Sequence, residues 1–199
     1  LLAALDLEQG ANNTVQPVAP DQAVYLKVFQ RTLVISATVT FICLLMGFPL
    51  AYLLATTSTG TSNLLMIFVL LPFWTSLLVR TAAWIVLLQS GGLINRALIG
   101  AGIIEAPLEL VFNRLGVIIA MVHILLPFMI LPLYSVMKGI SPSYQRAAIS
   151  LGAHPFQAFW QVYIPQTLAG IAAGTILVFI MALGYYITPA LLGGPSDQM

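Results

Sequence analysis

The sequence predicts an all-α membrane protein, built as a bundle of kinked transmembrane helices. Hydrophobic residues make up 60% of the 199 residues and charged residues only 7%, and the mean hydropathy is +1.00. Soluble domains carry about 25% charged residues, so an ordinary soluble domain is excluded. Four apolar stretches exceed the roughly 20 residues that a helix needs to cross a bilayer. None of them alternates with a period of two, which argues against a membrane β-barrel.

The charge and the cysteine content exclude several kinds of partner. A net charge of +1 provides no basic surface for a nucleic acid. The single cysteine, Cys43, excludes a disulfide framework and a zinc site built on thiolates. We therefore expect no metal site and no nucleic-acid partner, and we expect membrane lipid around the chain.

The sequence divides into a polar N-terminal segment and a domain of four predicted spans. A polar segment over residues 1–28 precedes a predicted transmembrane domain over residues 29–199. This domain contains four predicted spans, at residues 33–55, 64–88, 115–137 and 168–192. Each span contains proline, which removes a helix hydrogen bond and tends to kink the helix. The prolines are Pro49, Pro72, Pro127, Pro132 and Pro189.

The longest polar interruption, residues 138–167, has the pattern of two short helices joined at a glycine. Ser141 is a good N-cap and Pro142 suits the first helical position. Gly152 suits the left-handed conformation that ends many helices. A second short helix is predicted at 155–164. The loop therefore predicts a helix, a sharp corner and another helix.

One face of the first loop helix is apolar. Tyr144, Ala147, Ala148 and Leu151 recur at the spacing of a single helix face. The two alanines at its centre allow another surface to approach closely. A short amphipathic helix of this kind suits insertion into a groove of a partner protein.

Ala147 and Ala148, followed by Gly152 and then by Ile164 and Pro165, resemble the EAA loop of type I ABC importer permeases. The family pattern begins with a glutamate, where this chain has an arginine. The resemblance implies a cytoplasmic loop that contains the coupling helix and docks on an ATPase subunit. The implied ATPase-coupling residues are Tyr144, Arg146, Ala147, Ala148, Leu151, Gly152, Ile164 and Pro165.

Further motifs are similar to the spermidine/putrescine branch of these permeases. They are Leu71-Pro72-Phe73-Trp74-Thr75-Ser76, Val79-Arg80-Thr81, Leu125-Leu126-Pro127-Phe128-Met129, Pro132-Leu133-Tyr134 and Ile187-Thr188-Pro189-Ala190-Leu191-Leu192-Gly193-Gly194. The resemblance implies a multi-pass permease subunit of the bacterial inner membrane, with about six helices in the full subunit and four in this chain.

The same resemblance implies the partners. A periplasmic substrate-binding protein would deliver putrescine or spermidine, and a second, homologous permease subunit would complete the translocation path. Separate ABC ATPase subunits would bind ATP and magnesium, so this chain would need no cofactor of its own.

The charge distribution and the resemblance disagree about orientation. The side with segment 1–28 and residues 89–114 carries four basic residues, and the other side carries only Lys138 and Arg146. The positive-inside rule alone would place the first side in the cytoplasm. The resemblance instead places loop 138–167 in the cytoplasm and the N-terminal segment outside. We follow the resemblance, because helices beyond the two ends would carry flanking charges that are not counted.

Arg80 is the one charged residue within a predicted span. A charge in a span usually faces the bundle interior or water, which favours a residue of the translocation path. A snorkelling or locally paired structural arginine is the alternative. Aromatic and hydroxyl side chains near the same path could contact a passing cation, although ordinary helix packing explains them equally well. They are Trp74, Thr75, Tyr134, Tyr185, Tyr186 and Thr188.

The sequence contains no HExxH, GxSxG or GxxxxGK[ST] motif. We therefore expect a transport subunit without its own ATPase site, and not an enzyme. One alternative is an ABC importer permease for another small solute, such as an opine, an amino-acid-like compound or a phosphonate. Another is an ion-coupled secondary transporter, which would need intramembrane carboxylates that the predicted spans lack. A membrane assembly protein without transport activity is a third.

Overall fold

The computed structural model describes residues 7–9, 15–17 and 25–193. Two short strands, β1 (Leu7–Gln9) and β2 (Val15–Pro17), pair in antiparallel orientation. The remaining regular structure of the described residues is helical. The predicted all-α membrane fold is confirmed by these helices and by their length and apolar composition.

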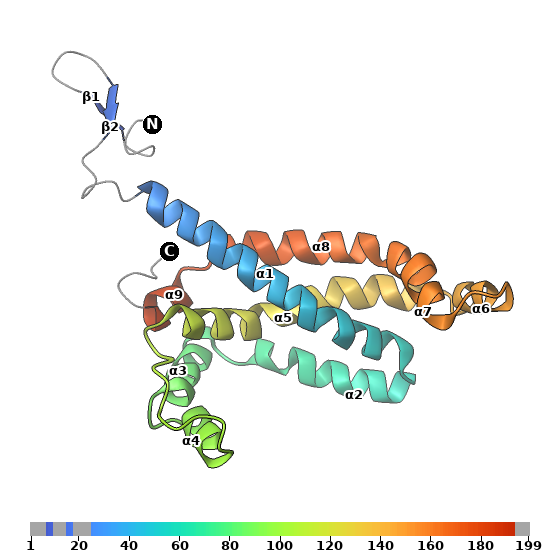
Figure 1. Cartoon of the computed structure of the whole chain (residues 1–199), viewed down its shortest axis with the longest axis horizontal. Helices are drawn as coiled ribbons and strands as arrows, with labels where there is room; N and C mark the ends of the chain where they lie inside the picture. Colours follow the sequence, from blue (N-terminus) through green and yellow to red (C-terminus); the bar gives the residue numbers. More distant parts are fainter. Residues whose placement is uncertain (1–6, 10–14, 18–24, 194–199) are drawn as a thin grey trace.

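Three long helices form the centre of the molecule (Figure 1). They are α1 (Tyr25–Thr56), α5 (Arg114–Gly139) and α8 (Ile164–Leu183). Each of them packs against the other two, and α8 runs back along the pair formed by α1 and α5. Pro49 lies inside α1, and Pro127 and Pro132 lie inside α5, without ending either helix.

The helices α1 and α5 cover the predicted spans 33–55 and 115–137 and extend beyond them. α1 begins at Tyr25, four residues before the predicted start of the transmembrane domain at residue 29. The extension is understandable because a helix can continue past the hydrocarbon region, where its polar residues meet water and headgroups.

The three central helices approach one another closely around the side chain of Met129 in α5. A Cβ atom at Gly47 of α1 would lie 2.9 Å from Met129 Cγ, and one at Gly174 of α8 would lie 2.8 Å from Met129 Sδ. Gly170, one turn before Gly174, similarly faces Val136 Cβ at 3.1 Å. Small residues at such positions let membrane helices pack closely, which matters because lipid provides no hydrophobic drive between helices.

The predicted span 64–88 is wrong as a single helix. The structure has three pieces there, α2 (Thr59–Leu70), the 3₁₀ turn η2 (Leu71–Trp74) and α3 (Leu77–Leu88). Thr75 and Ser76 between them are extended. The N–H and the hydroxyl of Thr75 both donate to the carbonyl of Pro72, at 3.3 and 2.9 Å. Mean hydropathy does not detect this break, because two hydroxyl residues scarcely change the average of a long apolar stretch.

A short helix, α4 (Leu93–Gly100), follows α3. Its buried Asn95 holds the loop before α5 in place. The Asn95 amide nitrogen donates to the carbonyls of Gln89 (3.1 Å) and Leu108 (2.9 Å), and its oxygen accepts from the N–H of Leu108 at 2.9 Å. These bonds satisfy backbone groups that would otherwise be unpaired.

Two more predictions are wrong: that the last span covers residues 168–192, and that the loop before it continues to residue 167. Residues 155–183 form one continuous helical stretch that ends at Gly184. It consists of α7 (Pro155–Ala158), the π-helical segment η3 (Phe159–Tyr163) and α8. The short helix α9 (Ile187–Leu192) follows after Tyr185 and Tyr186. Only α6 (Ser143–Ser150) and its flanking residues remain outside the long helices at this end.

Four helical stretches are long and apolar enough to cross a membrane. They are Tyr25–Thr56, Leu77–Gly100, Arg114–Gly139 and Pro155–Leu183, and Thr59–Trp74 is a shorter apolar stretch. The start of α1, the helices α3 and α4, and α9 lie toward one end of the bundle, and α6 lies at the opposite end (Figure 1).

We expect Gly174→Val to push α8 away from α5, because the new side chain would overlap Met129. Overpacking of this kind costs about 1–3 kcal/mol. The thermal unfolding midpoint of the purified protein in detergent should therefore fall. Gly60→Val is the matched control, because nothing lies within 4 Å of a Cβ atom at Gly60. An equal fall in both variants would contradict the close packing around Met129.

Candidate functional site

The first candidate site is the corner formed by α6 and α7. The Ser141 hydroxyl accepts a hydrogen bond from the N–H of Ser143 at 3.3 Å, although Pro142, and not the predicted Ser141, is the N-cap residue of α6. At the other end Gly152 has a φ of +94°, a conformation that strongly favours glycine. The N–H of Ala153 then reaches back to the carbonyl of Ala148 at 3.1 Å, as in a Schellman motif. The predicted helix–glycine corner is therefore present.

The start of α7, the helix after the corner, is also capped by hydrogen bonds. His154 Nδ1 accepts from the N–H of Phe156 at 3.3 Å, while the N–H of His154 donates to Gln157 Oε1 at 3.2 Å. This reciprocal pair is a capping box built on histidine. Hydrogen bonds therefore define the backbone on both sides of the corner, at the end of α6 and at the start of α7.

The predicted apolar face of α6 is open in the described structure. Tyr144 and Ala147 are exposed, Ala148 is half-buried, and Leu151 is 89% exposed. Arg146 is also exposed, and its Nε bonds back to a carbonyl of its own helix. A rigid helix that presents an apolar face at the tip of the molecule has the form of a docking element.

Ile164 and Pro165, the other two predicted coupling residues, lie inside the long helix instead of at its end. Pro165 has no N–H and its ring would crowd a carbonyl one turn earlier in a regular helix. The π-helical segment directly before it avoids this conflict, with the N–H of Ile164 bonded five residues back to the carbonyl of Phe159. The proline thus shapes the helix and does not end it.

An aromatic cluster attaches this π-helical segment to α1. The ring of Tyr52 in α1 meets Phe159 and Tyr163 edge-on, with centroids 5.6 and 5.3 Å apart. Phe159 and Tyr163 stack on each other at 5.6 Å. Sequence reasoning missed Tyr52. Phe156 and Trp160, in the same helical stretch, are exposed.

The second candidate site is a polar cluster where α3 packs against α5 and α9. Trp84 Nε1 donates to His123 Nδ1 at 3.3 Å, and the two rings meet edge-on with centroids 5.3 Å apart. Arg80 lies one helical turn before Trp84 in α3, and its positive charge acts electrostatically on His123 and Tyr185. We call Arg80, Trp84, His123 and Tyr185 the polar cluster. The pair of Trp84 and His123 was not predicted as a site, although polar ring atoms in apolar spans are its signal in the sequence.

The remaining predicted path residues do not form one surface. Trp74 is 90% exposed and Tyr186 is also exposed, whereas Thr188 in α9 is fully buried with an unpaired hydroxyl. Tyr134 lies eleven residues after His123 in α5, which places it about 16 Å away along the helix, toward α6. The structure therefore brings Arg80 and Tyr185 together and separates Tyr134 from them. The hydroxyl of Thr75 closes the helix break described above.

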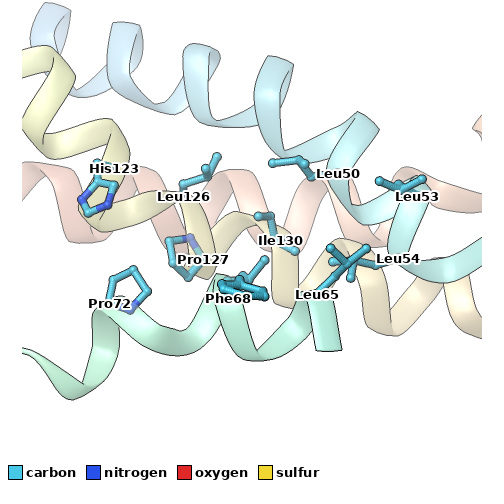
Figure 2. Close-up of a pocket in the computed structure, with 11 residues that line it drawn as sticks. Leu50, Leu53, Leu54, Leu65, Phe68, Pro72, His123, Leu126, Pro127 and Ile130 are labelled. Carbon is cyan, nitrogen blue, oxygen red and sulfur yellow. The ribbon is translucent and has the colours of Figure 1, made fainter. Parts of the chain in front are cut away.

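A cavity of about 310 Å³ lies beside the polar cluster, between α1, α2 and α5. Figure 2 shows Pro72 and His123 at one end of it and apolar side chains along the rest. Its lining residues are Leu50, Leu53, Leu54, Leu65, Phe68, Val69, Pro72, His123, Leu126, Pro127 and Ile130. Because the lining is almost wholly apolar, this cavity suits hydrocarbon better than a charged solute.

Comparison with known proteins agrees with the sequence motifs. The sequence model of the family described as "Binding-protein-dependent transport system inner membrane component" matches residues 33–198. The spermidine/putrescine transport system permease protein PotB of Haemophilus influenzae is 41% identical over 170 residues, or 85% of this chain and 59% of that protein. PotB of Escherichia coli is 36% identical over 175 residues, or 88% of this chain and 64% of that protein.

A third relative is the inner membrane ABC transporter permease protein YdcU of Escherichia coli, which is 34% identical over 83% of this chain and 57% of that protein. The chain thus spans about 60% of the length of these relatives. Among solved structures, a bacterial ABC transporter that imports the acidic polysaccharide alginate matches with a TM-score of 0.63 and 20% identity. That match covers 87% of this chain and 62% of the transporter chain, and it supports the fold.

Proposed function

Since the chain belongs to the family of binding-protein-dependent transport system inner membrane components, we propose that it is a permease subunit of an ABC importer for polyamines. The observation that carries the permease role is the rigid, exposed corner of α6 at one end of the membrane bundle. The polyamine substrate rests on the similarity to PotB proteins of two organisms.

The partners in this proposal follow from the same two observations. The open face of α6, around Ala147 and Ala148, is the surface that an ABC ATPase subunit would cover. That ATPase would bind ATP and magnesium, and this chain would hold neither. A second permease subunit would complete the path, and a periplasmic binding protein would deliver putrescine or spermidine at the opposite end of the bundle.

The long helix of residues 155–183 supplies the mechanical connection. A movement of the docked ATPase would displace α6, and the hydrogen-bonded corner at Gly152 would pass this displacement to α7. The cluster of Tyr52, Phe159 and Tyr163 would then carry it to α1. Alternation between inward and outward openings would follow from two arrangements of these helices, each favoured by a different set of partners.

A second candidate substrate is a small solute with an anionic group, such as an opine or a phosphonate. The observation that favours it is Arg80, whose cationic side chain lies in the polar cluster beside His123. The similarity to PotB makes polyamines the first choice, and the transport assay below separates the two.

For the substrate, we expect proteoliposomes with the complete transporter and its binding protein to accumulate radiolabelled spermidine when ATP is inside. Unlabelled putrescine should compete for uptake, and octopine and methylphosphonate should not. Uptake should persist after protonophore and sodium ionophore are added, because the ATPase supplies the energy. Accumulation of an opine or phosphonate in place of spermidine would contradict the polyamine proposal, and collapse with the ionophores would contradict the ABC mechanism.

For coupling, we expect Gly152→Val and Ala148→Arg to abolish the stimulation of ATPase activity by loaded binding protein. The valine would strain a backbone with φ of +94° by about 1–2 kcal/mol, and the arginine would prevent close docking. Membrane insertion and yield should stay normal, as fluorescence-detected size exclusion can show. Gly100→Val is the control, because a Cβ atom at Gly100 meets nothing within 4 Å. Full stimulation in both variants would place the docking surface elsewhere.

For orientation, we propose that α6 faces the cytoplasm and the N-terminal segment lies outside. In a Cys43→Ala background, a cysteine introduced by Ser143→Cys should resist a membrane-impermeant maleimide in intact cells and react after permeabilisation. A cysteine introduced by Glu105→Cys lies in the exposed loop before α5 and should react in intact cells. The reverse labelling pattern would mean that the count of basic residues gives the true orientation.

A further inference from the structure

The side chain of Arg80 is an unpaired charge within the described structure. Its Nε atom is buried and has no hydrogen-bond partner among the described residues. Its two described electrostatic neighbours are His123 and Tyr185. A histidine and a tyrosine do not neutralise a guanidinium, so the cluster keeps a net positive charge.

This charge lies at a depth where it is costly. One helical turn after Arg80, Trp84 of α3 donates to His123, which is nine residues after Arg114 and sixteen before Gly139 in α5. At about 1.5 Å per residue, His123 is roughly 13 Å from one end of α5 and 24 Å from the other. Both distances place the cluster within the apolar part of the bilayer. A charge there is normally paired with another charge or placed in a water-filled cavity.

The described chain supplies no carboxylate at this depth. Its described acidic residues are Glu8 in β1 and Glu105 and Glu109 in the loop before α5, all outside the span-length helices. A second copy of this chain would bring another Arg80 and the same lack of a carboxylate in the described spans. No described residue of this chain can supply the counter-charge for Arg80, so we look for it in the second permease subunit of the proposed importer.

The position of Arg80 on α3 leaves room for such a protein. One face of α3 is covered, with Thr81 and Leu88 buried and Trp84 half-buried. The other face exposes Leu78, Val79, Ala82, Ala83 and Val86. Arg80 is half-buried and lies at the border between these two faces. Its guanidinium can thus reach a group on a helix that packs against the open, apolar face.

We propose that Arg80 forms a salt bridge with an aspartate or glutamate in a membrane-spanning helix of a second, non-identical permease subunit. The pair sets the register between the two subunits at the polar cluster and removes the unpaired positive charge beside the path. A polycationic substrate then passes a neutral pair and not an isolated cation. This inference rests on the proposed permease function, but the ion pair itself is independent of which solute is carried.

The test is charge reversal in the complete transporter with its own second permease. Arg80→Glu and Arg80→Gln should each lower the yield of co-purified second permease and the rate of solute uptake, by roughly tenfold or more, because one partner of a buried pair is left alone. Arg96→Gln is the matched control, since Arg96 is exposed on α4, and should leave both readouts unchanged. Each membrane-embedded Asp and Glu of the second permease is then changed to arginine in the Arg80→Glu background.

One of these double variants should restore assembly and uptake, although its second-permease change alone is as harmful as Arg80→Glu. A second measurement does not depend on transport activity. In a Cys43→Ala background, Arg80→Cys should form a disulfide with a cysteine placed in the second permease at the position of the restoring substitution. The absence of any restoring or cross-linking position in the second permease would overturn the proposal. Restoration by Asp197→Arg in this chain, a residue outside the described ones, would also overturn it.

These outcomes separate the ion pair from the substrate. If the wild-type transporter carries no polyamine but the charge reversal still restores assembly, the polyamine proposal is contradicted and the proposal of the ion pair is supported. If a transported anion protects the cysteine of Arg80→Cys from a maleimide, Arg80 contacts the solute and the ion pair falls.

Discussion

The close approach of α1, α5 and α8 around Met129 is the constraint on which the rest of the structure depends. Gly47 and Gly174 contact this side chain from opposite helices, and a Cβ atom at either glycine would lie under 3.0 Å from it. In a membrane the attraction between helices comes from such close packing, because the surrounding lipid is as apolar as the side chains. The three central helices can therefore act as a rigid frame, while α2 and α3, which have fewer neighbours, are attached to its side.

Along this frame, the exposed apolar face of α6 and the polar cluster lie at different positions. At one end, α6 is held by helix caps and a glycine corner and shows its apolar face. Farther along the bundle, the polar cluster around Arg80 and His123 lies where two helices are interrupted, at Thr75–Ser76 and at Gly184–Tyr186. Interrupted helices in a membrane are tolerated where protein or water satisfies the freed backbone groups. The breaks thus coincide with the polar part of the described interior.

The sequence predicted some of these features and missed others for identifiable reasons. α1 and α5 follow from their uniform apolar character, and the corner at Gly152 follows from the requirement for a left-handed residue there. The helix break at Thr75 and Ser76 was missed because two hydroxyl residues scarcely change the mean hydropathy of a long apolar stretch. The second loop helix was predicted to end at residue 164, but a π-helical segment lets the helix continue through Pro165. Arg80 was found because a charge in a span is conspicuous, whereas its neighbour His123 depends on packing between distant segments.

The correction at Pro165 changes how the two ends are connected. A loop followed by a span would absorb a displacement of α6 in its flexible residues. The structure instead has a helical stretch of 29 residues, about 43 Å long, which starts beside the corner of α6 and ends two residues before Tyr185 of the polar cluster. A displacement at one end of such a stretch reaches the other unless the helix bends. Bending is easiest at the π-helical segment, where the regular hydrogen bonds are already interrupted. The contacts of Tyr52 with Phe159 and Tyr163 fall on this same segment, so α1 resists bending at the point where the long helix is weakest.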